Sequence, residues 1–222
     1  MLFKLYSLFF KNLYKNFLVH KSIPLATKGA LMNHKYNINK LHVVETETED
    51  KLYKKKELFK KFEEFISQSG FTVEKWVKSN AVPYEVIIAD KNENQISYRI
   101  ILYLKNISDA GWVYKPWMKR VQVDNVRSVS PEYYINTERN QALLILGYYN
   151  YDDNPIMVAW NPYRYVMHFT QRSCYVTIDE MLEGYKKGYH KCFVSNQKVW
   201  IFTANNFRIF LNDYIDSNKV EE

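Results

Sequence analysis

The sequence predicts an α+β fold with a mainly antiparallel sheet and flanking helices, and three observations support this prediction. Short apolar runs are separated by polar turns, as where D-K-N-E-N-Q lies between the runs at 84–89 and 96–105. Apolar residues recur at helical spacing in 51–69 and again near the C-terminus. The 222 residues are 47% hydrophobic and 17% aromatic, which supplies one sizeable core. Because short hairpins join antiparallel strands, we expect the helices to flank one mainly antiparallel sheet.

Residues 1–31 are interpreted as a basic amphipathic extension. They carry lysines and no acidic residue, and the lysines interrupt the apolar run before it reaches the roughly 20 residues that a bilayer requires. The extension is a helix docked on the domain, an interfacial anchor, or an upstream piece outside the working protein. Ordinary polar composition begins at Met32, which favours the third interpretation, with Met32 as the start. Neither a secretory signal nor a membrane partner is expected.

Most of the excess positive charge belongs to this extension. The formal net charge is +7, yet residues 32–222 hold 26 basic against 24 acidic residues. A basic surface on the globular part must therefore be a local patch. The two cysteines, Cys174 and Cys192, fit a reducing cytoplasm. His168 and His190 lie near them, but the usual zinc spacings are missing, so structural thiols are favoured over a zinc site.

Residues 32–50 are polar, end in E-T-E-T-E-D and are interpreted as a linker. A single globular domain is expected over 51–216. It opens with the helix at 51–69, where Leu58, Phe62 and Phe65 share one face and Gly70 supplies the stop. The lysines of this helix lie on the other faces, where solvent is favoured over phosphate as their partner.

The later elements follow from apolar runs and cap signals. Thr177 and Glu180 have capping-box spacing and open a helix that ends at Gly188, and Asn205 is expected to cap a final helix. The predicted strands are Tyr84–Ala89, Ile96–Lys105, Lys119–Val123, Gln141–Tyr149, Ile156–Asn161 and Lys198–Thr203.

The stretch from Ser97 to Val123 interleaves cations with aromatic rings around a loop rich in Gly, Pro and Trp. This pattern suits a polyanion that also offers stackable faces, as nucleic acid does. An ordinary hairpin with solvated lysines and core aromatics is the simpler interpretation, and composition alone favours it. If the stretch forms a two-stranded ribbon, it is narrow enough to enter the major groove of duplex DNA.

Catalytic motifs are mostly missing. The sequence contains no glycine-rich phosphate loop, no G-x-S-x-G and no H-E-x-x-H. A metal-dependent nuclease requires carboxylates that hold Mg²⁺ and a lysine near the scissile phosphate. Glu85, Asp90 and Lys105 are the candidates, although an aromatic residue, Tyr103, occupies the place of the second acid. A hairpin without catalytic function is the favoured interpretation of this region.

The order of several segments resembles a domain of restriction-modification proteins. These segments are Y-R-I-I-L-Y-L-K-N-I-S, M-K-R-V-Q-V, L-L-I-L-G-Y and M-V-A-W-N-P, followed by a helix, a strand and a last helix between Tyr84 and Tyr214. The resemblance implies sequence-specific or modification-sensitive binding of duplex DNA. The polar positions that match the family pattern are Arg99, Asn106, Lys119, Arg120 and Gln122. The loop departs from the pattern, because it contains Trp112, Tyr114 and Trp117 where the family has a plainly polar connection.

Three functions follow as hypotheses. The leading one is a DNA-binding component of a restriction-modification system that needs no cofactor for binding and leaves cleavage to a nuclease or methyltransferase partner or to a degenerate metal site. The second is the Mg²⁺-dependent type II restriction endonuclease itself. The third is a structural or membrane-surface protein anchored by residues 1–20. The expected DNA-binding residues are Arg99, Lys105, Asn106, Lys115, Trp117, Lys119, Arg120 and Gln122.

The sharpest expectation concerns the strand that contains Arg120 and Gln122. Residues two apart in a strand point to the same face, so these two side chains are expected to project together while Val121 and Val123 pack inward. Lys119 shares the inward parity but is expected to turn back to solvent at the strand end and contact phosphate. Alternatively, Arg120 makes an intramolecular ion pair with Asp124.

Overall fold

The computed structural model describes residues 50–92, 96–123, 140–151, 153–162 and 173–217, together with the backbone of 35–37 and 42–44. The last two segments form an antiparallel pair, β1 (Lys35–Asn37) and β2 (His42–Val44), inside the region predicted as a linker. The predicted extension, 1–31, lies outside the described residues. No helix in the described part of the chain is both long and apolar enough to cross a bilayer.

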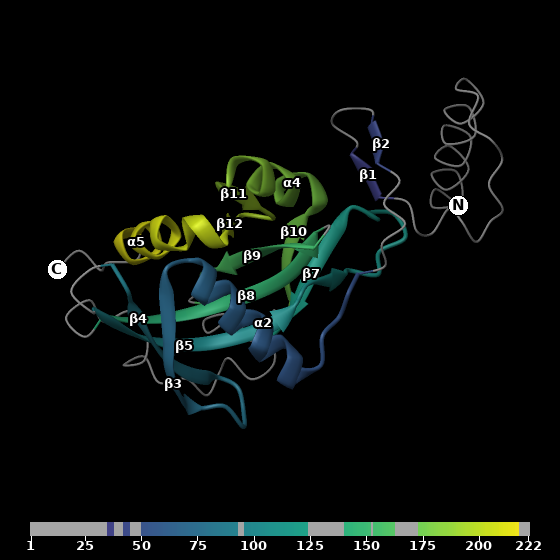
Figure 1. Cartoon of the computed structure of the whole chain (residues 1–222). Helices are drawn as coiled ribbons and strands as arrows, with labels where there is room; N and C mark the ends of the chain where they lie inside the picture. Colours follow the sequence, from purple (N-terminus) through teal and green to yellow (C-terminus); the bar gives the residue numbers. More distant parts are fainter. Residues whose placement is uncertain are drawn as a thin grey trace, which may run out of the picture.

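The main sheet has seven strands in the order β11-β12-β9-β8-β5-β4-β3 (Figure 1). Its neighbouring strands are antiparallel except for β5 and β8, which run parallel. The prediction of an α+β fold with a mainly antiparallel sheet is therefore confirmed. The strands are β3 (Phe71–Lys78), β4 (Tyr84–Asp90), β5 (Ser97–Asn106), β8 (Gln141–Tyr151), β9 (Asn154–Trp160), β11 (Tyr189–Val194) and β12 (Gln197–Thr203).

A small second sheet begins in the connection between β5 and β8 and is completed by a strand that follows β9. Two parallel strands cannot be joined by a tight turn, so the chain must leave the main sheet between them. The small sheet has the order β10-β7-β6, and both of its pairs are antiparallel. Its strands are β6 (Ser108–Asp109), β7 (Met118–Gln122) and β10 (Ser173–Thr177).

This arrangement contradicts the predicted two-stranded ribbon. The strands β5 and β7 were expected to pair around the loop, but β5 lies between β4 and β8 in the main sheet while β7 lies between β10 and β6. The apolar run of β5 explains the difference, because Leu102 and Leu104 are buried on one face of the main sheet and Ile101 and Tyr103 on the other. A strand buried on both faces belongs in the centre of a sheet and cannot enter a DNA groove.

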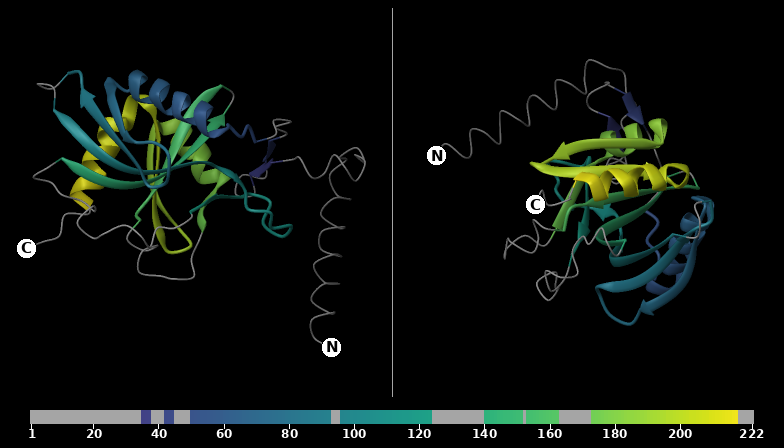
Figure 2. Two further views of the ribbon diagram at one scale, coloured as in Figure 1. Left: turned by 90° about the horizontal axis from the view of Figure 1, so that it is seen from below. Right: turned by 90° about the vertical axis from the view of Figure 1, so that its left-hand side faces the viewer.

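Two helices cover one face of the main sheet (Figures 1 and 2). They are α2 (Lys55–Gln68) and α5 (Phe207–Ser217), the second preceded by a short 3₁₀ turn, η5 (Ala204–Asn206). Phe62 and Phe65 of α2 and Phe210 of α5 are fully buried in the core that they form with the sheet. The opposite face of the sheet packs against the small sheet and α4 (Ile178–Lys187), which form a second core.

Local signals placed the C-terminal ends of α2 and α4 and the start of α4 correctly. The backbone of Gly70 and Gly188 is left-handed, with φ of 82° and 76°, where α2 and α4 end. The Thr177 hydroxyl accepts a hydrogen bond of 3.3 Å from the backbone N–H of Glu180, as capping-box spacing predicts. The start of α2 was placed too early, because residues 51–54 precede the helix and the N-cap residue, Lys54, is extended. Asn106 holds them there through hydrogen bonds to both the N–H and the C=O of Tyr53, at 3.1 and 2.8 Å.

Six of the strands in the described part of the chain were not predicted from the sequence. They are β1, β2, β3, β6, β10 and β11, which are short or rich in polar residues. The expected cap at Asn205 is also displaced, because this residue lies in η5 and α5 begins two residues later. Short, half-polar runs of this kind become strands only when a neighbouring strand completes their hydrogen bonds, which no local pattern reveals.

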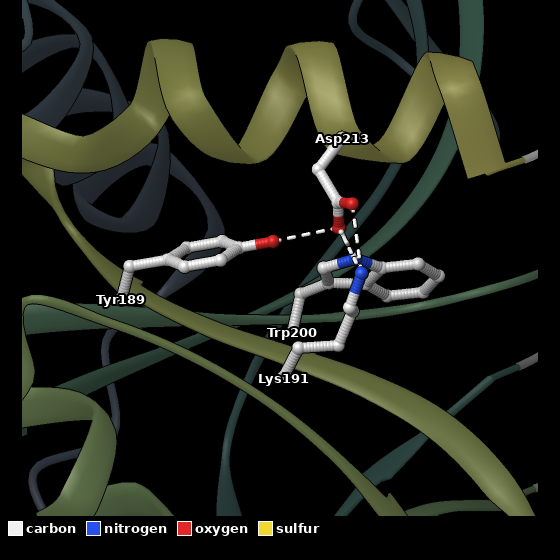
Figure 3. Close-up of polar contacts among 4 residues, drawn as sticks. All are labelled: Tyr189, Lys191, Trp200 and Asp213. Atoms are coloured by element: carbon white, nitrogen blue, oxygen red, sulfur yellow. Dashed lines mark hydrogen bonds and ion pairs between the residues drawn. The ribbon is translucent and has the colours of Figure 1, made fainter.

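Asp213 of α5 links the helix to β11 and β12, the strands at one edge of the main sheet (Figure 3). Its carboxylate accepts hydrogen bonds from the Tyr189 hydroxyl and the Trp200 indole N–H, both at 2.7 Å, and from the Lys191 ammonium at 2.8 and 3.1 Å. Burial alone would raise the pKa of Asp213, but these donors outweigh it and lower the pKa to about 2. One carboxylate therefore connects β11, β12 and α5.

Gly147 of β8 allows the small sheet to approach the main sheet closely. A Cβ atom at this position would lie 2.5 Å from Ile107 Cγ1 and 2.8 Å from Val121 Cγ2. We therefore expect Gly147→Ala to lower the free energy of unfolding by about 1–3 kcal/mol, because the added methyl group overpacks the second core. Urea unfolding followed by tryptophan fluorescence measures this change. An unchanged midpoint would show that the two sheets are not in close contact here.

Candidate nucleic-acid interface

The outer face of the small sheet carries the residue pair that the pleat predicts. Arg120 is half-buried and Gln122 exposed, while Val121 and Val123 are buried in the second core. This part of the prediction is confirmed. Arg120 lies opposite Tyr175 of β10, and Gln122 lies opposite Ser173, so these four side chains share one face. Asp124, the alternative partner of Arg120, lies outside the described residues.

The loop before β7, residues 110–117, has a defined backbone built from two successive turns. The N–H of Lys115 donates to the carbonyl of Trp112 at 2.9 Å, and the N–H of Met118 donates to the carbonyl of Lys115 at 3.0 Å. The Trp117 carbonyl then accepts a bond of 3.0 Å from the N–H of Ile178, the first residue of α4. Pro116 lies at the second position of the second turn, where its fixed φ is favourable.

Aromatic rings gather where this loop meets the outer face. The rings of Trp112 and Tyr114 are nearly parallel, with an angle of 4° and centroids 6.1 Å apart. Trp112 also contacts Tyr175, with centroids 4.8 Å apart. The Lys115 ammonium lies 5.4 Å from the centroid of Trp112 and 5.9 Å from that of Tyr114. Val113 and Tyr114, at the loop tip, are 92% and 71% exposed.

We call the set Arg120, Gln122, Tyr175, Trp112, Tyr114 and Lys115 the aromatic–cationic face. It combines two cations with one exposed and two half-buried aromatic rings, an arrangement suited to contacts with phosphates and with bases or sugars. Tyr175 was not identified in the sequence. The alternation in S-C-Y-V-T, with Cys174 and Val176 buried, is the signal that would have placed it on an outward face.

Lys119 was expected to contact phosphate, and the structure contradicts this. Its side chain is 1% exposed, and its ammonium is ion-paired with Asp50 at 2.5 Å and with Asp109. It also lies 5.9 Å from the ring centroid of Tyr149. Burial and the neighbouring Asp50 carboxylate raise the pKa of Tyr149, so this ring stays neutral. Lys119 lies on the inward side of β7, where the buried Asp50 carboxylate pairs with its ammonium, so its side chain has no need to turn to solvent.

The other expected DNA-binding residues are dispersed. Arg99 is on the main sheet, where it binds the Glu85 carboxylate at 2.7 Å and the Gln141 amide oxygen at 3.4 Å. The amide of Asn106 is occupied by the backbone of Tyr53. Lys105 is half-buried on β5, and Trp117 is half-buried at the end of the loop. Of the eight nominated residues, Lys115, Arg120 and Gln122 lie on the aromatic–cationic face.

The nuclease candidates do not form one site. Glu85 and Asp90 are five residues apart on β4 and point to opposite faces, which separates them by about 17 Å along the strand. Two oxygens on one Mg²⁺ lie within about 4 Å of each other. Asp90 is 1% exposed and accepts a hydrogen bond of 2.5 Å from Arg208, and Glu85 is paired with Arg99. These two carboxylates therefore cannot share a metal ion.

The comparisons with known proteins identify the family. No curated protein and no solved structure matches the chain. One family model, described as Methylase-associated X1, matches residues 98–211, just over half of the 222 residues. The match begins in β5 and continues through the small sheet and α4 to the first half of α5, so it includes the whole aromatic–cationic face. The chain therefore belongs to the Methylase-associated X1 family, a domain of proteins associated with restriction-modification systems.

Proposed function

We propose that this protein is a DNA-recognition component of a restriction-modification system and binds duplex DNA with its aromatic–cationic face. The observation that carries the proposal is the alignment of Arg120 and Gln122 on the solvent side of β7, beside the stacked rings of the loop at 110–117. Family membership supports a role in such a system. Cleavage or methylation is then the task of a partner chain, a methyltransferase or a nuclease.

The chemistry of this face matches the task. Arginine makes bidentate hydrogen bonds to guanine in the major groove and glutamine does so to adenine, so the pair can read adjacent bases. Lys115 adds a phosphate contact, which contributes affinity without sequence information. The exposed ring of Tyr114, stacked on the half-buried ring of Trp112, offers flat apolar surface to a base or a sugar. The nearly neutral net charge of residues 32–222 means that binding must depend on this local patch.

Arg120→Ala tests base reading. A random duplex library is first selected with the wild-type protein, and the affinity for the selected and the unselected duplexes is then measured by fluorescence anisotropy over a salt series in EDTA. We expect Arg120→Ala to cost about 1–3 kcal/mol on the selected duplex and less on random duplex, because a lost base contact reduces discrimination. Equal losses on both duplexes would remove the base-reading role.

Matched variants separate the face from general charge effects. Trp112→Ala removes the centre of the ring stack and is expected to weaken binding to both duplexes by about 1–3 kcal/mol, the usual value of one stacking contact. Lys60→Ala is the control, because this lysine is 75% exposed on α2, which covers the opposite face of the main sheet. Wild-type protein that binds neither methylated nor unmethylated duplex at low salt would disprove the proposal.

A further inference from the structure

A cluster of three potential metal ligands lies on α4 and β11, apart from the aromatic–cationic face. His190 and Cys192 are two residues apart on β11 and share one side of the strand, and Glu180 comes from the first turn of α4. His190 Nε2 and Glu180 Oε2 are 2.5 Å apart. The ligand atoms of the three residues all lie within 4.8 Å of one another, and each residue is partly buried.

We propose that Glu180, His190 and Cys192 form a binding site for a divalent cation of the zinc class. The donor set contains one sulfur, one imidazole nitrogen and one carboxylate oxygen. Thiolate and imidazole favour zinc and its neighbours in the first transition series, whereas Mg²⁺ and Ca²⁺ prefer oxygen ligands only. Three protein ligands leave one position of a tetrahedral zinc ion open to water or to another ligand.

The present geometry is close to that of such a site. In a tetrahedral zinc site the ligand atoms lie about 3.3–3.6 Å from one another. The cluster spans a range from 2.5 Å to at most 4.8 Å, so side-chain rotations of roughly an ångström bring the three atoms to coordinating distance. The backbone that carries these side chains is held in place, because β11 pairs with β12 along its whole length and Thr177 caps the start of α4.

A simple reactive thiol is the main alternative, and its surroundings argue against it. Burial, reinforced by the neighbouring Glu180 carboxylate, raises the pKa of Cys192 to about 12. The thiol is therefore protonated at neutral pH and is a poor nucleophile. A divalent cation reverses this preference, because it stabilises the thiolate and the carboxylate together and releases the thiol proton to solvent.

Cobalt titration of the full-length chain, purified under reducing, metal-free conditions, tests the site. A thiolate bound to Co²⁺ produces a charge-transfer absorption in the near ultraviolet that oxygen and nitrogen ligands do not. We expect this band to saturate at one Co²⁺ per chain and to disappear when Zn²⁺ is added, since Zn²⁺ binds more tightly to such ligands. Absence of the band at millimolar Co²⁺ would overturn the proposal.

Paired variants assign the ligands. Cys192→Ser is expected to abolish the band, whereas Cys174→Ala, at the chain's other cysteine in β10, keeps it. Glu180→Gln is expected to weaken Co²⁺ binding at least about tenfold, while Glu183→Gln, on the same helix but paired with Lys187, leaves it unchanged. Circular dichroism establishes that each variant is folded. A band that survives Cys192→Ser, or equal effects of the two glutamine variants, would disprove the assignment.

Discussion

Replacement of Lys119 by alanine is expected to lower the free energy of unfolding by about 3–5 kcal/mol, the usual cost of breaking a buried ion pair by removing one partner. Lys119 is 1% exposed and Asp50 9% exposed, so the variant leaves the Asp50 carboxylate buried without its cation. Asp109 is 67% exposed and contributes less, because water screens it. Equilibrium unfolding in urea measures the loss.

Two further variants make this prediction specific. Lys60→Ala, at an exposed i,i+4 pair with Glu64, is expected to change the stability by less than about 0.5 kcal/mol. The double variant Lys119→Met with Asp50→Leu is expected to lose less than the sum of the two single variants, because each single change leaves the other charge buried. A loss below about 1 kcal/mol in Lys119→Ala would show that the ammonium reaches solvent after all.

The second large effect is expected at Asp213. Asp213→Ala removes the acceptor for the indole N–H of Trp200, which is fully buried, and for the Tyr189 hydroxyl. An unsatisfied buried donor costs about 1–3 kcal/mol, so we expect a total loss of about 2–4 kcal/mol. Thermal unfolding monitored by circular dichroism measures this loss of stability. Asp216→Ala, an exposed acid on the same helix, is the control.

The lowered pKa of Asp213 also predicts a pH dependence. Its folded pKa of about 2 lies below the unfolded value near 3.8, so its contribution to stability is fully present above about pH 4 and is lost as the pH falls towards 2. Asp213→Asn is expected to flatten the decline in the free energy of unfolding between pH 4 and 2. An identical acid limb in the variant and the wild type would show that the three donors do not depress the pKa.

The sequence by itself determined the features that depend on neighbouring residues. The ends of α2 and α4 follow from Gly70, Gly188 and Thr177, because left-handed glycines and capping hydroxyls act within one helical turn. The shared face of Arg120 and Gln122 follows from the pleat of a strand, whichever strand is its partner. These features include Arg120 and Gln122 of the aromatic–cationic face, the helices α2, α4 and α5, and the strands β4, β5, β7, β8, β9 and β12.

Only the tertiary structure decided which segments meet. Lys119 pairs with Asp50, 69 positions away in the sequence, and Asn106 binds the backbone of Tyr53, 53 positions away. No local sequence pattern therefore distinguishes Lys119 and Asn106 from lysine and asparagine residues that contact DNA. Because β5 pairs in parallel with β8, β7 lies in the small sheet and not beside β5. There β7 pairs with β10, which places Tyr175 opposite Arg120. Long-range pairing depends on the burial of whole faces, and that is a property of the assembled sheets rather than of any one segment.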